Sequence, residues 1–144
     1  MAQLFTSVSP GMTEEFELAY FRELAGYFGG IYYGCCKRID DRLELVIKIP
    51  NQRKVSCSPW SDQDSFAEKI GPKITMSAKP NPSYLAMDSV NYDSVERDLR
   101  RTVDTAKRHN VNLELILKDV STVRYAPARL DKWNELAMRI VSDS

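Results

Sequence analysis

The most reactive side chains of the sequence are two adjacent cysteines, Cys35 and Cys36, at the end of a short apolar segment. A thiolate can ligate a soft metal ion or act as a nucleophile. Because successive residues of a strand face opposite sides, we expect one thiol to enter a site and the other to pack in the core. The alternative is that both are small buried residues at a strand end. Cys57 lies on the apolar face of its predicted strand and is therefore a poor third metal ligand.

Charged and aromatic side chains follow the later predicted strands. Lys79 is expected either to bind an anionic group or to rest its aliphatic stem on apolar surface at a strand end. Lys118, Asp119 and Arg124 form either a charged rim for a carboxylate or phosphate, or a set of ion pairs that orders the final loop. Trp60 either lines a pocket or packs in the core.

The elements that must position these residues alternate between helix and strand. Hydrophobic spacing and turn residues predict strands over residues 31–34, 54–58, 74–78 and 113–117, with helices before, between and after them. Residues 79–91 are expected to form a long loop, and Pro127 to open the final helix. The whole chain, 1–144, is predicted to be a single domain.

The first helix is expected to begin with Thr13 as its N-cap. Four aromatic and aliphatic residues then recur at intervals of four and predict a buried stripe, which Phe21 and Ala25 widen. The four are Phe16, Tyr20, Leu24 and Phe28. Residues 1–12 contain proline and glycine without clear periodicity, which predicts a lead-in loop.

Strict alternation of strands and helices predicts a parallel α/β sheet. Each predicted strand has an apolar face and a polar face, and the polar faces carry Ser56, Ser58, Thr75, Ser77, Lys79, Glu114 and Lys118. A doubly wound sheet is apolar on both faces. The pattern favours four β/α units preceded by a helix, which is half of a (β/α)8 barrel of about 250 residues. A small open sheet with helices on one side is the competing interpretation.

Composition narrows the function. The chain has 144 residues with 20 basic and 20 acidic side chains, so it offers no electrostatic case for nucleic acid or a membrane surface. Its apolar runs are too short to span a bilayer, and its N-terminus lacks the pattern of a secretory signal. Three cysteines cannot form a closed set of disulfides, so we expect a cytoplasmic location.

Four segments carry a resemblance to a known family: IYYGCCKRID from Ile31, RKVSCSPWSD from Arg53, MSAKPNP from Met76 and ILKDVSTVRYAP from Ile116. The chain resembles the C-terminal half of the uroporphyrinogen decarboxylase superfamily, in particular its branch of corrinoid-linked, cobalamin-dependent methyltransferases. The resemblance covers nearly the whole chain. It implies a (β/α)8 barrel more than twice as long, of which this chain would be the part after the fourth strand.

The zinc motif of that branch is incomplete here. The resemblance implies a His-x-Cys after the fifth strand and a cysteine after the eighth, which hold zinc and activate a substrate thiol. The matching positions are Tyr33-Gly34-Cys35 and residues 119–121, which contain neither the histidine nor the second cysteine. Only Cys35 carries over as a metal ligand, so we expect little zinc.

The other candidate site residues follow the strands, where barrel enzymes place their function. Asp119 and Arg124 belong to the family motif at the active face. The predicted catalytic residues are Lys79, Asp119 and Arg124, and the predicted ligand-binding residues are Tyr33, Trp60 and Lys118.

Two functions remain open. The first is an enzyme half that handles methyl transfer to or from a corrinoid, with a corrinoid protein as partner, or a related decarboxylation. The second is a non-catalytic half-barrel that binds a ligand or partner. Four strands cannot close a barrel, so we expect either a homodimer or a separate N-terminal half to complete it.

Overall fold

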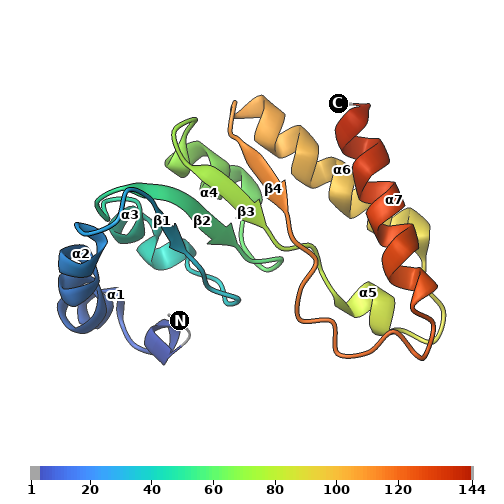
Figure 1. Cartoon of the computed structure of the whole chain (residues 1–144), viewed down its shortest axis with the longest axis horizontal. Coiled ribbons are helices and arrows are strands. Elements are labelled where there is room, and N and C mark those ends of the chain that lie inside the picture. The colour runs from blue at the N-terminus through green and yellow to red at the C-terminus, as the bar shows by residue number, and fades with distance from the viewer. Residues whose placement is uncertain (1–3, 144) are drawn as a thin grey trace.

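A computed structural model describes residues 4–143, in which four parallel strands form one sheet in the order β1-β2-β3-β4 (Figure 1). The strands are β1 (Ile31–Tyr33), β2 (Gln52–Cys57), β3 (Thr75–Ala78) and β4 (Leu113–Leu115). The register sets Ser56 beside Ser77 and Ser77 beside Glu114. The predicted parallel α/β sheet is therefore confirmed, with β4 two residues shorter than expected.

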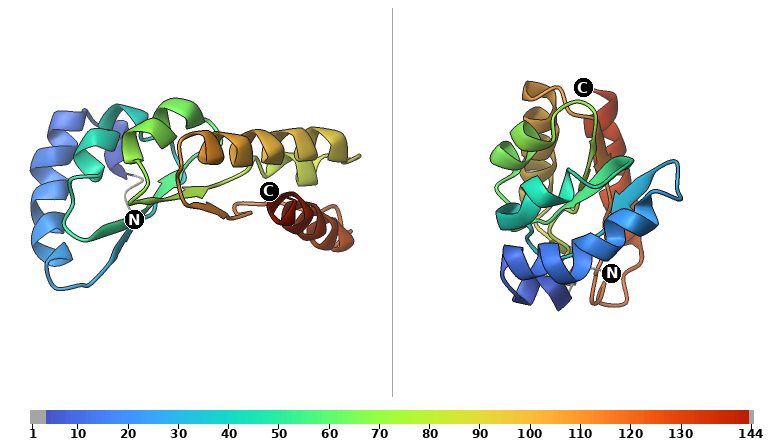
Figure 2. Two further views of the ribbon diagram at one scale, coloured as in Figure 1. Left: turned by 90° about the horizontal axis from the view of Figure 1, so that it is seen from above. Right: turned by 90° about the vertical axis from the view of Figure 1, so that its left-hand side faces the viewer.

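The helices are α1 (Pro10–Thr13), α2 (Ala19–Ala25), α3 (Leu43–Val46), α4 (Gln63–Ile70), α5 (Ser83–Ala86), α6 (Tyr92–Arg108) and α7 (Ala128–Ser142). A π-helical turn, Glu14–Leu18, joins α1 to α2, and a 3-10 turn, Asp40–Arg42, precedes α3. Strands in sequential order with crossovers of one hand place their helices on the same face of a sheet. Accordingly, α3, α4 and α6 all lie on one side of the sheet (Figure 2).

The core lies between the sheet and these helices. Val55, Cys57, Met76 and Ala78 point into it and are completely buried, whereas the residues that alternate with them face the other way. One hydrophobic cluster spans α2, α3, α4 and the first three strands, and a second lies between α6, α7 and β4. The helices therefore cover the apolar face and leave the polar face without a helical layer.

The start of the first helix differs from the prediction. Ser9 rather than Thr13 is the N-cap, since its hydroxyl accepts a hydrogen bond from Met12 N over 3.2 Å, and Pro10 occupies the first helical turn. The predicted lead-in loop is wrong for residues 4–7, which form a 3-10 turn, and for residues 10–12, which are helical. Residues 1–3 of that prediction lie outside the described part of the chain.

The predicted buried stripe is wrong for its four central residues. Phe16, Tyr20, Leu24 and Phe28 are each more than half exposed. Phe21 and Ala25, which widen the predicted stripe, do face the core, together with Leu18. The sequence contains two apolar stripes on this helix, and only one of them can face its own sheet.

Two segments between strands are ordered by a helix cap and by a short helix. Asp62 caps α4 by accepting hydrogen bonds from Asp64 N and Ser65 N, and Gly71 ends the helix with a positive φ of 62°. The loop over residues 79–91 contains the short helix α5, which begins at Ser83. The Asp62 cap and α5 follow the carboxyl ends of β2 and β3, whereas Gly71 precedes β3.

Candidate functional site

A continuous chain of polar contacts crosses the helix-free face of the sheet. Tyr32 Oη lies 2.8 Å from Ser56 Oγ and 3.2 Å from Ser77 Oγ, so one hydroxyl bridges two neighbouring strands. Ser77 Oγ donates to Glu114 Oε2 over 2.8 Å. Lys54 Nζ donates to Glu114 Oε1 over 2.7 Å, which extends the network from β1 to β4. The polar side chains of this face are therefore hydrogen-bonded to one another and not only to solvent.

Lys79 joins this network to the carboxyl edge of the sheet. It follows β3 directly and is only 5% exposed. Its Nζ donates to Ser56 Oγ and to Cys35 O, each over 2.7 Å. Burying an ammonium group is costly unless it is hydrogen-bonded, so these two acceptors explain how Lys79 is retained at this position.

A pocket of about 130 Å³ opens at that edge, where three strand ends and the segment after β1 meet. Its walls come from four segments of the chain and comprise Cys36, Pro59, Trp60, Lys79, Pro80, Pro82, Lys118 and Asp119. The predicted residues Lys79, Trp60, Lys118 and Asp119 are thereby brought together. Trp60 is 64% exposed, so it lines the pocket and is not a core residue.

The rim of the pocket is a thiol beside an ammonium group. Lys118 Nζ donates to Cys36 Sγ, and Asp119 Oδ2 lies 3.5 Å from the same Nζ. The contact with Cys36, followed by the nearby charge of Asp119, raises the pKa of Lys118, so this lysine keeps its positive charge. Asp119 adopts a positive φ of 59°, which turns the chain sharply enough for both Lys118 and Asp119 to border the pocket.

Cys35 and Tyr33 lie on the other side of the sheet from this pocket. Cys35 is 1% exposed in the hydrophobic core, which confirms that only one of the two adjacent thiols reaches the site. Tyr33 Oη donates to Glu17 at 3.1 and 3.2 Å, and its ring meets Phe21 edge to face. Burial raises the pKa of the Tyr33 phenol. The structure therefore places both side chains in the core, and only the backbone carbonyl of Cys35 contacts the pocket residue Lys79.

Arg124 lies in the final loop, away from the pocket. Its Nε donates to Ala86 O over 3.1 Å and its Nη2 pairs with Asp88 Oδ1 at 3.1 Å. Arg129 donates to three carbonyl groups of the same segment, from Leu85, Met87 and Asp88. These contacts hold the α5 segment against the final loop and α7. For Arg124 this agrees with the alternative in which ion pairs order the final loop.

Tyr32 is the site residue that sequence reasoning missed. It stands beside Lys54 in the register, and Lys54 Nζ lies 5.4 Å from the centre of its ring. Alternation along β1 contains the signal, since Tyr33 faces the core and its neighbour must face the polar side. The motif of the resembled family points to the adjacent Tyr33 instead.

The side chains do not fit the zinc site implied by the resemblance. Across residues 4–143 there is no group of three or more histidine, cysteine, aspartate or glutamate side chains placed to hold a metal ion. The candidate ligand Cys35 is enclosed in the core, and Tyr33 is engaged with Glu17.

Comparisons with known proteins do not add a family. No protein-family model matches the chain, and neither the curated proteins nor the solved structures that were searched contain a match. In the described part of the chain, no helix combines the length and the apolar character needed to cross a membrane. The function must therefore be argued from the site.

Proposed function

We propose that this chain is a half-barrel of the (β/α)8 type that binds a small anionic group in the pocket at the carboxyl edge of its sheet. The observation that carries the proposal is the convergence of Cys36, Lys79, Lys118 and Asp119 on one pocket from segments far apart in the sequence. In parallel α/β folds, ligands bind outside the carboxyl ends of the strands. Two ammonium groups and one carboxylate give the pocket a net positive lining.

The half-barrel interpretation is supported by the topology. The strand order is sequential, the strands are parallel, and α3, α4 and α6 lie on one face. The opposite face carries the Tyr32–Ser77–Glu114 network, which corresponds to the interior of a closed barrel. In a small open sheet, the outer members of this network, Tyr32, Lys54 and Glu114, would remain partly exposed.

The size of the pocket limits the ligand. Pockets for whole drug-sized molecules occupy roughly 300–1,000 Å³, and this one measures about 130 Å³. It suits a carboxylate side arm or a phosphate rather than a complete tetrapyrrole. A macrocycle would have to lie across the polar face with one acidic arm in the pocket.

The sequence resemblance makes corrinoid-linked methyl transfer the activity to test for the completed barrel. The corresponding assay uses visible absorbance to monitor the loss of the methyl group from methylcobalamin in the presence of an added thiol. Turnover that falls in Asp119→Asn supports this activity. The second candidate, a binding half-barrel without catalysis, is favoured by the incomplete zinc motif, and anion binding without turnover would select it.

Anion binding is tested by calorimetric titration with sodium propionate and, separately, with inorganic phosphate. Removing one charged donor costs about 1.5–3 kcal/mol, so Lys118→Met should weaken binding by about tenfold or more. Lys73→Met, which removes an exposed lysine before β3, is the matched control and should bind like the wild-type chain. Equal affinity in Lys118→Met and the wild-type chain would contradict the assignment, as would the absence of binding by either probe.

A further inference from the structure

One end of the molecule exposes an aromatic helix face. Phe16, Tyr20, Leu24 and Phe28, which we call the α2 stripe, are 54%, 71%, 53% and 53% exposed. Tyr20 and Leu24 are one turn apart on α2, whereas Phe16 lies in the preceding π-helical turn and Phe28 follows the helix. Neighbouring exposed apolar side chains of this kind are uncommon on monomeric proteins and often mark an interaction site.

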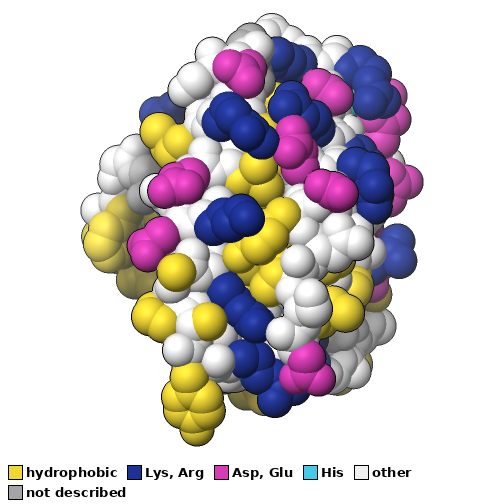
Figure 3. Space-filling view, turned by 90° about the vertical axis from the view of Figure 1, so that its right-hand side faces the viewer, with side chains coloured by type: hydrophobic (Ala, Val, Ile, Leu, Met, Phe, Trp, Pro, Cys, Tyr) yellow, Lys and Arg dark blue, Asp and Glu magenta, His cyan; other side chains and the backbone are white. Residues whose placement is uncertain are grey.

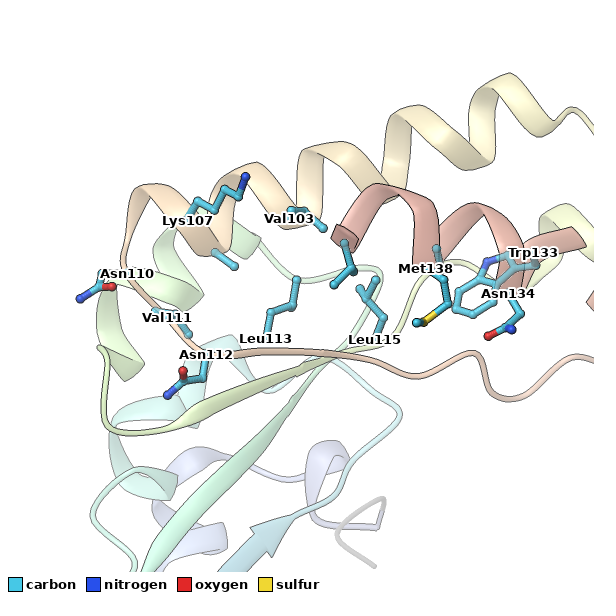
Figure 4. Close-up of a pocket in the computed structure, with 13 residues that line it drawn as sticks. Val103, Lys107, Asn110, Val111, Asn112, Leu113, Leu115, Trp133, Asn134 and Met138 are labelled. Carbon is cyan, nitrogen blue, oxygen red and sulfur yellow. The ribbon is translucent and has the colours of Figure 1, made fainter. Parts of the chain in front are cut away.

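The opposite end of the sheet contains an apolar groove. It lies between α6, α7 and β4 and has a volume of about 530 Å³ (Figure 4). The apolar lining of this α6–α7 groove includes Val103, Leu113, Leu115, Ala137, Met138 and Val141. Met138 and Val141 are at least half exposed, so the groove is open from outside.

Each apolar surface lies next to an unpaired strand. Within residues 4–143, β1 pairs only with β2, and β4 pairs only with β3. The α2 stripe belongs to the helix that leads into β1, and the α6–α7 groove is built over β4. Both ends of the sheet therefore combine free backbone hydrogen-bonding groups with exposed apolar side chains.

The charges of the two ends are complementary. The helical segment 10–25 carries Glu14, Glu15, Glu17 and Glu23 against the single basic residue Arg22. By contrast, α6 and α7 each carry one more basic than acidic residue. Figure 3 shows hydrophobic side chains exposed among charged ones at the α6–α7 end. Opposite net charges favour contact between unlike ends over contact between like ends.

We propose that a second copy of this chain covers both surfaces, with the α2 stripe of each copy packed into the α6–α7 groove of the other. This inference rests on the proposed half-barrel. A two-fold axis along the barrel pairs β1 of one copy with β4 of its partner twice and so closes eight strands. The pocket of each copy then opens into a shared interior, so the partner completes the walls of the site.

The number of helices explains why the stripe and the groove meet. A closed barrel has one helix outside each strand, whereas this chain places α2, α3, α4, α6 and α7 around four strands. Each junction between β1 of one copy and β4 of the other is called a seam. At each seam, α2 of one copy and α7 of the other must therefore share one position. An apolar stripe and an apolar groove allow these two helices to pack side by side.

The test uses Tyr20→Asp in the stripe and Met138→Lys in the groove, with mass measured by light scattering after size exclusion. The wild-type chain should have twice its 16.5 kDa mass at micromolar concentration. Each variant alone impairs both seams and should shift to the mass of one chain. An equimolar mixture should return to the dimer, because each mixed pair contains one seam with two native surfaces.

Tyr125→Asp is the matched control, since Tyr125 is a fully exposed tyrosine outside both surfaces, and it should remain dimeric. Circular dichroism confirms that the variants fold. The proposal is overturned by a monomeric wild-type chain, by dimeric Tyr20→Asp and Met138→Lys, by a mixture that stays monomeric, or by open-ended assembly. Propionate binding by the monomeric variants is measured in parallel, so failure of the dimer is distinguished from failure of the anion pocket.

Discussion

Lys54 and Glu114 form an ion pair, 2.7 Å from Nζ to Oε1, although a whole strand lies between them. The pair spans β3 on the polar face, where the short side chain of Ser77 lies between them and donates to the same carboxylate. Small residues on β3 thus let long side chains from β2 and β4 meet above it. This contact links the second and fourth strands on the face that we assign to the barrel interior.

The Lys54–Glu114 pair predicts a pH dependence of stability. The hydrogen bond from Lys54, aided by that from Ser77, lowers the pKa of Glu114 below its ordinary 4.5. Its contribution to the free energy of unfolding is therefore fully present above pH 4.5 and is lost as the pH falls through the lowered value. In urea unfolding, Glu114→Gln should be less stable than the wild-type chain at pH 7, and the difference should shrink near pH 3. Glu68→Gln on α4 should show no such difference, and a gap that is equal at both pH values would contradict this reasoning.

Arg42 is predicted to hold the N-terminal segment in place. Its guanidinium is 4% exposed and donates to Phe5 O, to Val8 O over 3.1 Å and to Thr13 Oγ1 over 2.7 Å. Arg42→Met leaves these acceptors without their donor and should lower the free energy of unfolding by about 2–3 kcal/mol. Arg38→Met removes an exposed partner of Asp40 and should change the free energy of unfolding by less than about 0.5 kcal/mol. Similar effects of the two substitutions in urea denaturation would refute this role for Arg42.

The three cysteines should differ sharply in reactivity in the native protein. Cys36 is partly exposed at the pocket, whereas Cys35 and Cys57 are buried, and burial raises the pKa of Cys57 to about 12. Iodoacetamide at pH 8 should therefore add one group per folded chain, at Cys36, and three in urea. Mass spectrometry of Cys36→Ser should show no rapid labelling of the folded chain. Fast modification of Cys35 or Cys57 would contradict the placement of these thiols in the core.

Short-range alternation explains what could be predicted. Along β2 and β3, the polar residues Ser56, Ser77 and Lys79 share one face because side chains alternate, and this holds whatever packs around them. Helix periodicity is weaker evidence where a helix has two apolar stripes. The Phe16 stripe and the Leu18 stripe have similar spacing, and only tertiary contacts with the sheet show which of them is buried.

Contacts between distant segments explain what could not be predicted. Cys36 and Lys118 are 82 residues apart, and their contact depends on how β1 and β4 end at the same edge. Arg42 is buried because backbone carbonyls of the N-terminal turn reach it, and no sequence pattern marks such acceptors. Lys79, Trp60, Lys118 and Asp119 were identified individually, but the 130 Å³ pocket that unites them follows only from the fold.

The most direct test of the central claim is to map where an anion binds, by following backbone amide NMR shifts of the wild-type chain during titration with sodium propionate. If the pocket at the carboxyl edge is the ligand site, the largest shifts should fall in residues 35–38, 58–62, 79–88 and 118–125. Lys118→Met should reduce them, and Lys73→Met should leave them unchanged. Shifts concentrated around Asn51 and Asn110 at the opposite edge, or in the α6–α7 groove, would contradict the account.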